Sequence, residues 1–184
     1  MKIKILIVTD GFSLITGYSI VAKNIYKILR DKYDIYFFSR IPYNPLDSEP
    51  VKNYICDSLK YDEHFAKVMN AITPDIVFTV GDLWKMTFVS EYKQRKWFRW
   101  VHYMGIEGKN YPAVFKSDGV LIPFKKLLES VDVIVPYSQF AKDEIERFGV
   151  KCENHIYHGV DTNVFKPKNI DRNKLLNELF DLII

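Results

Sequence analysis

Val131-Asp132-Val133-Ile134-Val135-Pro136-Tyr137-Ser138 is a β-branched apolar run that meets a proline and then a serine. Such a run is typical of a strand that is buried on both faces of a parallel sheet. Ser138 suits the N-cap of a helix that continues to Phe148, and Gly149 suits the C′ position that ends it. The sequence therefore predicts a strand, a helix and, beyond Gly149, a last short strand at residues 155–157.

The same alternation of strand and helix extends through the rest of the chain. Apolar runs predict strands at residues 3–9, 34–39, 54–56, 76–80 and 98–103. Apolar residues at helical spacing predict helices at residues 19–31, 65–72, 82–92, 124–129 and 175–180, with Ser19 and Asp82 as candidate N-caps. Residues 42–50 and 109–119 contain prolines and predict irregular loops.

This pattern predicts the fold class and the edge at which a ligand binds. Strands that alternate with helices build an α/β structure, a three-layer sandwich with a mostly parallel sheet covered on both faces. Ligands of such sheets bind outside the carboxyl ends of the strands. We therefore expect a site in the loops that follow Thr9, Val80, Tyr103 and Pro136.

Composition excludes several other classes of protein. Of 184 residues, 48% are apolar and 15% aromatic, which argues against disorder. The net charge of +3 is small for this length and does not imply a nucleic-acid partner. Apolar runs stay shorter than the roughly 20 residues of a membrane-spanning helix. Cys56 and Cys152 fit no metal or redox spacing and indicate two free thiols in a reducing compartment. We expect a cytoplasmic protein, and contact with a membrane surface is compatible with the sequence.

The first loop, residues 10–19, offers a candidate phosphate site. Gly17 lets the backbone approach a ligand, and the N–H groups at a helix start favour anions. A dinucleotide-binding loop would need three closely spaced glycines, and only Gly11 and Gly17 are present. A P-loop would need a lysine where Tyr18 stands. From the residues alone, a phosphate contact and a simple turn are equally good interpretations.

The loop after residues 98–103 carries two candidate catalytic side chains. His102 could position or polarise a sugar hydroxyl, and Glu107 could accept a hydroxyl hydrogen bond or act as a base. The alternative, which the residues alone favour, is a hydrogen-bonded core histidine and a solvated glutamate.

Two other patterns favour structural interpretations. His155, His158 and Asp161 invite a metal site, but side chains three apart on a strand point to opposite faces, so we predict no metal. Residues 91–100 interleave basic and aromatic side chains, which would suit anionic lipid or nucleic acid. A basic helix end followed by a buried strand explains them better, because cations favour the negative end of a helix dipole.

The chain as a whole resembles the N-terminal domain of family 4 glycosyltransferases of the GT-B architecture. The motifs that carry the resemblance are the first strand with Gly17-Tyr18-Ser19, the run Thr73-Pro74-Asp75-Ile76-Val77-Phe78, the segment from His102 to Gly108, the stretch from Val131 to Ser138, and His158-Gly159-Val160-Asp161 with Phe165-Lys166-Pro167. In the third, Met104-Gly105 and a late Pro112 depart from the family's usual pattern.

The resemblance implies a retaining, metal-independent transfer of a sugar from a nucleotide-diphosphate sugar to a sugar, lipid or protein acceptor, without a cofactor. By the same resemblance, Gly17 and its neighbour Tyr18 would approach the donor phosphates, and His102 would lie by the transferred sugar. The remaining candidates for lining the acceptor cleft are Asp82, Tyr103, Ser138 and His158.

Family members of this architecture close two Rossmann-like domains over a cleft, and the C-terminal domain holds most of the donor. The resemblance implies that residues 1–167 form the N-terminal, acceptor-side domain and that residues 168–184 lead into a donor-binding domain. This half would then be inactive alone. Two other classes stay open. One is a stand-alone sugar- or nucleotide-binding module, or a subunit of a split enzyme. The other is a flavodoxin-like nucleotide binder.

Overall fold

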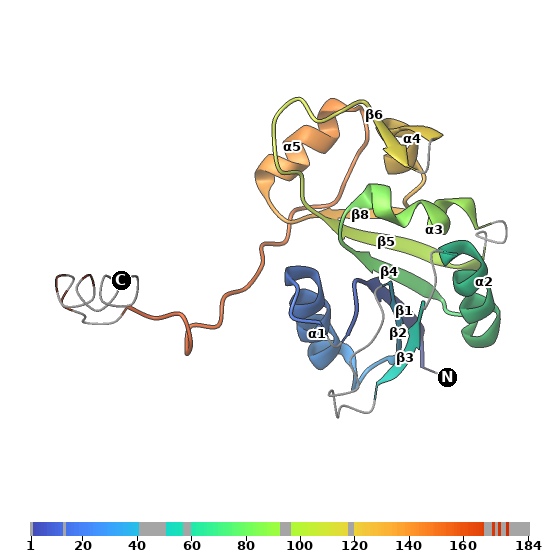
Figure 1. The fold of residues 1–184 in the computed structure, drawn as a ribbon, viewed down its shortest axis with the longest axis horizontal. Coiled ribbons are helices and arrows are strands. Elements are labelled where there is room, and N and C mark those ends of the chain that lie inside the picture. The colour runs from blue at the N-terminus through green and yellow to red at the C-terminus, as the bar shows by residue number, and fades with distance from the viewer. Residues whose placement is uncertain are drawn as a thin grey trace, which may run out of the picture.

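A computed structural model describes residues 2–12, 14–40, 51–56, 60–92, 97–117 and 120–167, together with residues 171, 173 and 176. Its strands are β1 (Lys4–Thr9), β2 (Asp34–Ser39), β3 (Lys52–Ile55), β4 (Ile76–Val80), β5 (Arg99–Met104), β6 (Val114–Ser117), β7 (Val120–Pro123) and β8 (Val133–Pro136). Its helices are α1 (Gly17–Leu29), α2 (Tyr61–Ile72), the 3₁₀ turn η1 (Leu83–Met86), α3 (Thr87–Glu91), α4 (Phe124–Glu129) and α5 (Gln139–Arg147) (Figure 1).

The main sheet has six strands in the order β3-β2-β1-β4-β5-β8, and every neighbouring pair is parallel. The chain builds outward from β1 in one direction and then from β4 in the other, so the order reverses between β1 and β4. A reversal of this kind is the topological switch point of a doubly wound sheet, and ligands bind in the crevice beside it. The predicted α/β, Rossmann-like class is confirmed.

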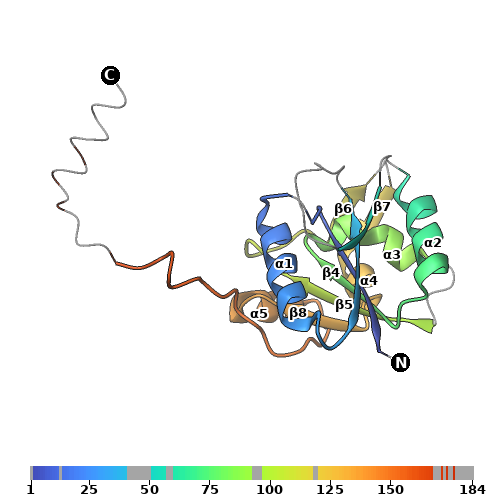
Figure 2. The same ribbon diagram turned by 90° about the horizontal axis from the view of Figure 1, so that it is seen from below.

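Two apolar layers cover the sheet, one on each face (Figure 2). Helix α1 covers one face, where Ile7, Phe37 and Ala22 are fully buried. Helices α2, α3 and α4 cover the other, where Phe65 and Trp100 are fully buried. Because successive strand residues point to opposite faces, a strand between two helical layers must be apolar throughout. This requirement explains why the strands were readable from their continuous apolar runs.

Helix caps confirm one prediction and correct another. The Ser138 side chain accepts a hydrogen bond from the Ala141 N–H, and Gly149 has φ of 74°, as expected for the two ends of α5. Helix α1, however, begins before Ser19. Thr16 is its N-cap, and Ser19 is a buried residue whose N–H donates to the Thr16 hydroxyl. The sequence offers two hydroxyl residues three apart, and either could cap the helix.

Part of the predicted loop at residues 109–119 is a strand. β6 pairs with β7 in an antiparallel hairpin, with Ser117 opposite Val120. Two residues, Asp118 and Gly119, stand between these positions in the sequence. Asp-Gly is a strong signal for a two-residue hairpin connection, and it could have revealed the pair.

The predicted strand at residues 155–157 does not form. The segment instead follows β8 through two isolated hydrogen bonds, from the Glu153 N–H to the Ile134 carbonyl and from the Ile156 N–H to the Pro136 carbonyl. These donors are three residues apart, whereas a strand ladder repeats every two, so regular pairing cannot continue. After this segment the chain extends away from the sheet as far as residue 167 (Figure 1).

Other expectations fall partly outside the described residues. The loop at 42–50, residues 93–96 of the basic stretch at 91–100, and all of the helix at 175–180 except residue 176 lie outside the described residues. Cys56 and Cys152 do not form a disulfide with each other, and Cys56 is buried. No helix in the described part of the chain combines the length and apolar character needed to cross a bilayer.

Candidate functional site

A cavity of about 270 Å³ opens at the carboxyl edge of the sheet, where the fold predicts a site. Each segment that lines it follows a different strand. The lining side chains and backbone come from Tyr18, Asp82, Trp84, Gly105, Ile106, Glu107, Tyr111, Tyr137 and Ser138. Four of the residues predicted from sequence, Tyr18, Asp82, Glu107 and Ser138, are therefore brought together on its walls.

Tyr18 and Asp82 join the two sides of the switch point. The Tyr18 hydroxyl, in the first turn of α1, donates a 2.7 Å hydrogen bond to Asp82 Oδ1, just after β4. The other oxygen of Asp82 lies 2.7 Å from Lys85 Nζ. Asp82 was expected to cap the following helix, but its side chain forms no capping bond. The carboxylate is instead used to connect α1, the end of β4 and η1.

Glu107 lies on the loop after β5, where its side chain is exposed and lines the cavity. In the described part of the chain, no hydrogen bond or ion pair of its carboxylate is recorded. The loop comes close to Tyr137, because a Cβ on Gly105 would lie 2.7 Å from Tyr137 Cδ2. A glycine at position 105 therefore lets the β5 loop and the β8 loop form one continuous wall.

Tyr137 is the centre of an aromatic cluster at the end of β8. Its ring centroid lies 4.5 Å from that of Tyr103 and 4.2 Å from that of His158. Tyr103 is buried, and its hydroxyl donates a 2.6 Å hydrogen bond to the Ile156 carbonyl. Tyr103 and His158 thus hold the segment after α5 against the site without lining the cavity. Desolvation lowers the pKa of His158 below its ordinary value.

His102 lies behind the cavity wall and is fully buried. Its Nδ1 is 2.6 Å from the Thr79 hydroxyl, which also accepts a 2.8 Å hydrogen bond from the Trp100 Nε1–H. Its Nε2 has no hydrogen-bond partner within the described residues. Burial lowers the pKa of His102 to about 3, although the hydrogen bond to Thr79 and the charge of Asp82 oppose this shift. The ring is neutral at physiological pH.

Gly17 is exposed at the start of α1, and no atom lies within 4 Å of the position that a Cβ would take. The open space suits the approach of a ligand to the helix N-terminus. Asp10 lies beside this helix start, with Oδ2 3.2 Å from the Thr16 hydroxyl and Oδ1 3.7 Å from Arg40.

Burial and, to a smaller extent, nearby carboxylates raise the pKa values of the tyrosines that line the cavity. Burial raises the pKa of Tyr18 strongly, and the hydrogen bond to Asp82 and the charges of Asp82, Glu107 and Asp10 add to this. Burial raises the pKa of Tyr111 strongly, and Asp82 and Glu107 contribute. The three hydroxyls of Tyr18, Tyr111 and Tyr137 are protonated at physiological pH.

Sequence reasoning missed the aromatic walls. Trp84, Tyr111 and Tyr137 line the cavity but were read as helix, loop and strand-end residues. Trp84 stacks on Phe115 of β6 with ring centroids 4.9 Å apart, so the unpredicted hairpin supports this wall. The available signal was the position of Tyr137 directly after a strand, at the edge where binding loops gather.

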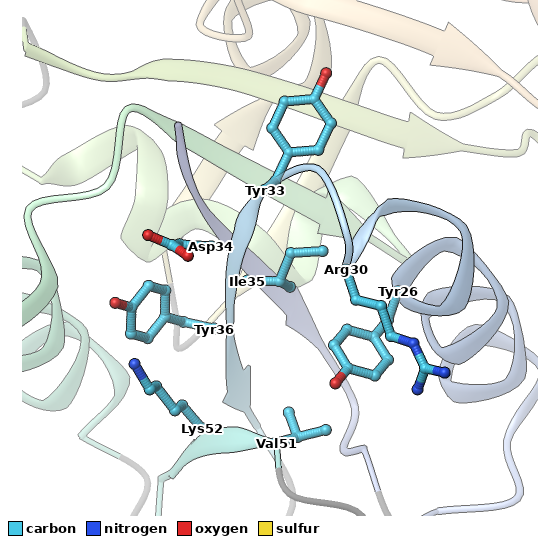
Figure 3. A pocket seen from close by; sticks show the side chains of 8 residues that line it. All are labelled: Tyr26, Arg30, Tyr33, Asp34, Ile35, Tyr36, Val51 and Lys52. Atoms are coloured by element: carbon cyan, nitrogen blue, oxygen red, sulfur yellow. The ribbon is translucent and has the colours of Figure 1, made fainter. Parts of the chain in front are cut away.

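A second cavity, of about 180 Å³, lies near the opposite ends of β2 and β3. Its cations are already paired with tyrosines, since Lys52 Nζ lies 5.0 Å from the Tyr36 ring centroid and Arg30 Cζ lies 5.9 Å from that of Tyr26. Figure 3 shows Asp34, Tyr36 and Lys52 on one side of β2 and Tyr26, Arg30 and Ile35 on the other. We therefore take the cavity at the carboxyl edge as the candidate site. No group of three or more potential metal ligands occurs among the residues that the structure describes.

Comparison with known proteins identifies the fold. No protein-family model and no curated protein matches the sequence. An α-glucosyltransferase solved in complex with UDP and a 13-mer DNA containing a HMU base has a TM-score of 0.56 at 12% identity over 85% of this chain. The UDP-GlcNAc 2-epimerase from Methanocaldococcus jannaschii has a TM-score of 0.50 at 16% identity over 82% of this chain.

These structures share a GT-B-like fold with this chain. The chain spans 42% of the first neighbour and 43% of the second, so it corresponds to less than half of each. At these identities the likeness concerns the fold alone. It supports the predicted Rossmann-like half of a GT-B structure. Membership of family 4 and the N-terminal position of this half stay predictions.

Proposed function

We propose that this chain is the acceptor-side half of a glycosyltransferase that uses a nucleotide-diphosphate sugar. The observation that carries the proposal is the cavity at the switch point, where Tyr18 is bonded to Asp82 and the Glu107 carboxylate faces open space. A volume of about 270 Å³ is near the lower end for small-molecule sites and suits one or two sugar rings. By their titles, one structural neighbour is a glucosyltransferase bound to UDP and another is a UDP-GlcNAc 2-epimerase, which agrees with this substrate class.

In this proposal Glu107 contacts the acceptor. Its carboxylate accepts a hydrogen bond from the acceptor hydroxyl and can take the proton as that oxygen bonds to the anomeric carbon on the face that the nucleoside diphosphate leaves, which retains the configuration. The bond from the anomeric carbon to the nucleoside diphosphate breaks as the new one forms. Ser138 and the aromatic walls orient the sugar, and Asp82 keeps Tyr18 in place.

His102 has an indirect role in the proposal. Its ring is neutral and fully buried and does not line the cavity, so we assign it the role of a positioning residue. Donor phosphates would lie outside the negative cavity, near the exposed Gly17 and the free space at the start of α1. Tyr103 and His158 hold the segment that leads toward residues 168–184.

The proposal includes a donor-binding half, which is either a further domain or a partner subunit. It also includes retention of configuration, independence of metals and a cytoplasmic location. The alternative is a sugar-binding module without chemistry of its own. The absence of a nucleic-acid partner stays a prediction, and the DNA in one neighbour's title makes it worth testing.

The test is binding and turnover by the 184-residue chain. Ligand-observed NMR with simple hexoses should show binding that Glu107→Gln weakens and that Glu146→Gln, an exposed change on α5, leaves intact. Incubation with radiolabelled UDP-hexose and the same sugars should give no transfer by this half alone. Failure to bind any sugar would contradict the glycosyltransferase proposal. Efficient transfer would contradict the proposal that this chain supplies only the acceptor-side half of the enzyme.

A further inference from the structure

We propose that the ligand of the carboxyl-edge cavity is a sugar that carries a protonated amine. This inference rests on the proposed function and narrows its acceptor. Three features of the described residues lead to it, namely the charge of the lining, its aromatic rings and an unpartnered tyrosine hydroxyl.

The lining carries two carboxylates and no cation. Asp82 and Glu107 line the cavity, and none of the described lining residues is lysine or arginine. Lys85 is bound to Asp82 from outside the cavity, with 45% of its side chain exposed. Solvent weakens this ion pair, and Glu107 has no recorded ion pair in the described chain. The carboxylates would repel an anionic ligand, whereas a cationic ligand would neutralise the charge of Glu107.

Aromatic rings form most of the remaining wall. Tyr18, Trp84, Tyr111 and Tyr137 all line the cavity, and the centroids of Trp84 and Tyr111 lie 5.9 Å apart. The face of an aromatic ring attracts a cation, most strongly for tryptophan, and recognition of ammonium groups by such rings is common. A neutral sugar would use the apolar character of these rings but not their attraction for charge.

The third feature is the hydroxyl of Tyr137. It is buried and has no hydrogen-bond partner within the described residues, although Tyr137 lines the cavity. A buried polar group without a partner is uncommon in proteins and indicates that something else completes it. An ammonium has only donors, so it can satisfy both this oxygen and the Glu107 carboxylate.

The test compares glucosamine, N-acetylglucosamine, glucose and glucose 6-phosphate as ligands of the full chain. Calorimetry or NMR titration is done at one ionic strength and at a pH where the amine is protonated. Glucosamine should bind about fivefold more tightly than glucose, which corresponds to one solvent-exposed charge interaction. N-acetylglucosamine, which has lost the charge, should bind like glucose, and glucose 6-phosphate should bind most weakly.

Two matched variants assign the effect to the cavity. Glu107→Gln should reduce the preference for glucosamine over glucose to about twofold or less, whereas Glu146→Gln should keep it. Trp84→Leu should also reduce the preference, because it removes the ring but not a charge. Circular dichroism checks that each variant is folded.

The outcomes separate this inference from the function on which it rests. If glucosamine and glucose bind equally, or if Glu107→Gln leaves the preference unchanged, the inference that the ligand carries an amine is wrong. The proposal that the cavity binds a sugar is then unaffected. Tighter binding of glucose 6-phosphate also overturns it. If none of the four sugars binds, both this inference and the proposed function are wrong.

Discussion

The Tyr18 hydroxyl donates a 2.7 Å hydrogen bond to Asp82 Oδ1, and the two residues are 64 positions apart in sequence. One lies in the first turn of α1 and the other directly after β4. Their strands are neighbours at the point where the strand order reverses. The bond therefore fixes the distance between the two loops that border the binding crevice, and four of the following predictions concern this edge of the sheet.

Tyr18→Phe should lower the free energy of unfolding by about 1 kcal/mol. The change removes a hydrogen bond to a half-buried carboxylate, whereas Lys85 still partly compensates its charge. Urea unfolding measures the effect. Tyr33→Phe is the control, because the Tyr33 hydroxyl has no hydrogen bond to any of the described residues, so the variant should match the wild type. Equal losses in both variants would show that the Tyr18–Asp82 bond contributes nothing.

Gly105→Ala should cost about 1 to 3 kcal/mol of stability. The new Cβ would lie 2.7 Å from Tyr137 Cδ2 and force the ring, or the β5 loop, to move. Gly108→Ala is the matched control on the same loop, since nothing lies within 4 Å of its Cβ position. It should change stability by less than about 0.5 kcal/mol. Thermal and urea unfolding measure the stability of both variants. If Gly105→Ala is as stable as Gly108→Ala, residue 105 is not closely packed against Tyr137.

His102 should make stability depend on pH. Its pKa is about 3 in the folded chain and ordinarily about 6.5, so the unfolded chain binds more protons between these values. Its contribution is complete above about pH 6.5 and is lost as the pH falls toward 3, at up to about 1.4 kcal/mol per pH unit. Urea unfolding between about pH 4.5 and pH 7 should show a shallower slope for His102→Gln than for the wild type. Parallel slopes would mean that the ring is not buried neutral.

His102→Ala should also destabilise the fold, by about 2 to 4 kcal/mol, because it removes a fully buried ring and leaves the Thr79 hydroxyl with one partner fewer. A loss of activity in that variant alone would not place His102 at the reacting atoms. A folded His102→Ala whose unfolding midpoint equals that of the wild type would contradict the buried network.

Gly17→Val should leave the fold intact and weaken the binding of a nucleotide. The site of its side chain is open, so we expect a change in stability below about 1 kcal/mol. In ¹H–¹⁵N NMR spectra, UDP should shift the amide signals of the first turn of α1 in the wild type and shift them less in the variant. Equal shifts in both proteins would remove Gly17 from the phosphate site.

The amino-acid sequence by itself determined the six strands of the main sheet, most of the helices and the edge where the site lies, but not the β6–β7 hairpin. Strands buried between two helical layers must be apolar along their whole length, and Ile76–Val80 and Val133–Pro136 are readable for that reason. Ser138 was readable as an N-cap because the capping bond is local. The position of Tyr18, Asp82, Glu107 and Ser138 near one another followed from the rule that parallel strands end at a common edge.

Only the tertiary structure decided which of these side chains face the cavity. His102 is a core residue and not a wall residue because it is fully buried beside Thr79 of the neighbouring strand, and no local pattern encodes that packing. The same is true of Tyr137, whose ring fits only because residue 105 is a glycine on another strand's loop. Such contacts join residues far apart in sequence, so they are fixed by the shape of the whole sheet edge and not by any single stretch of the chain.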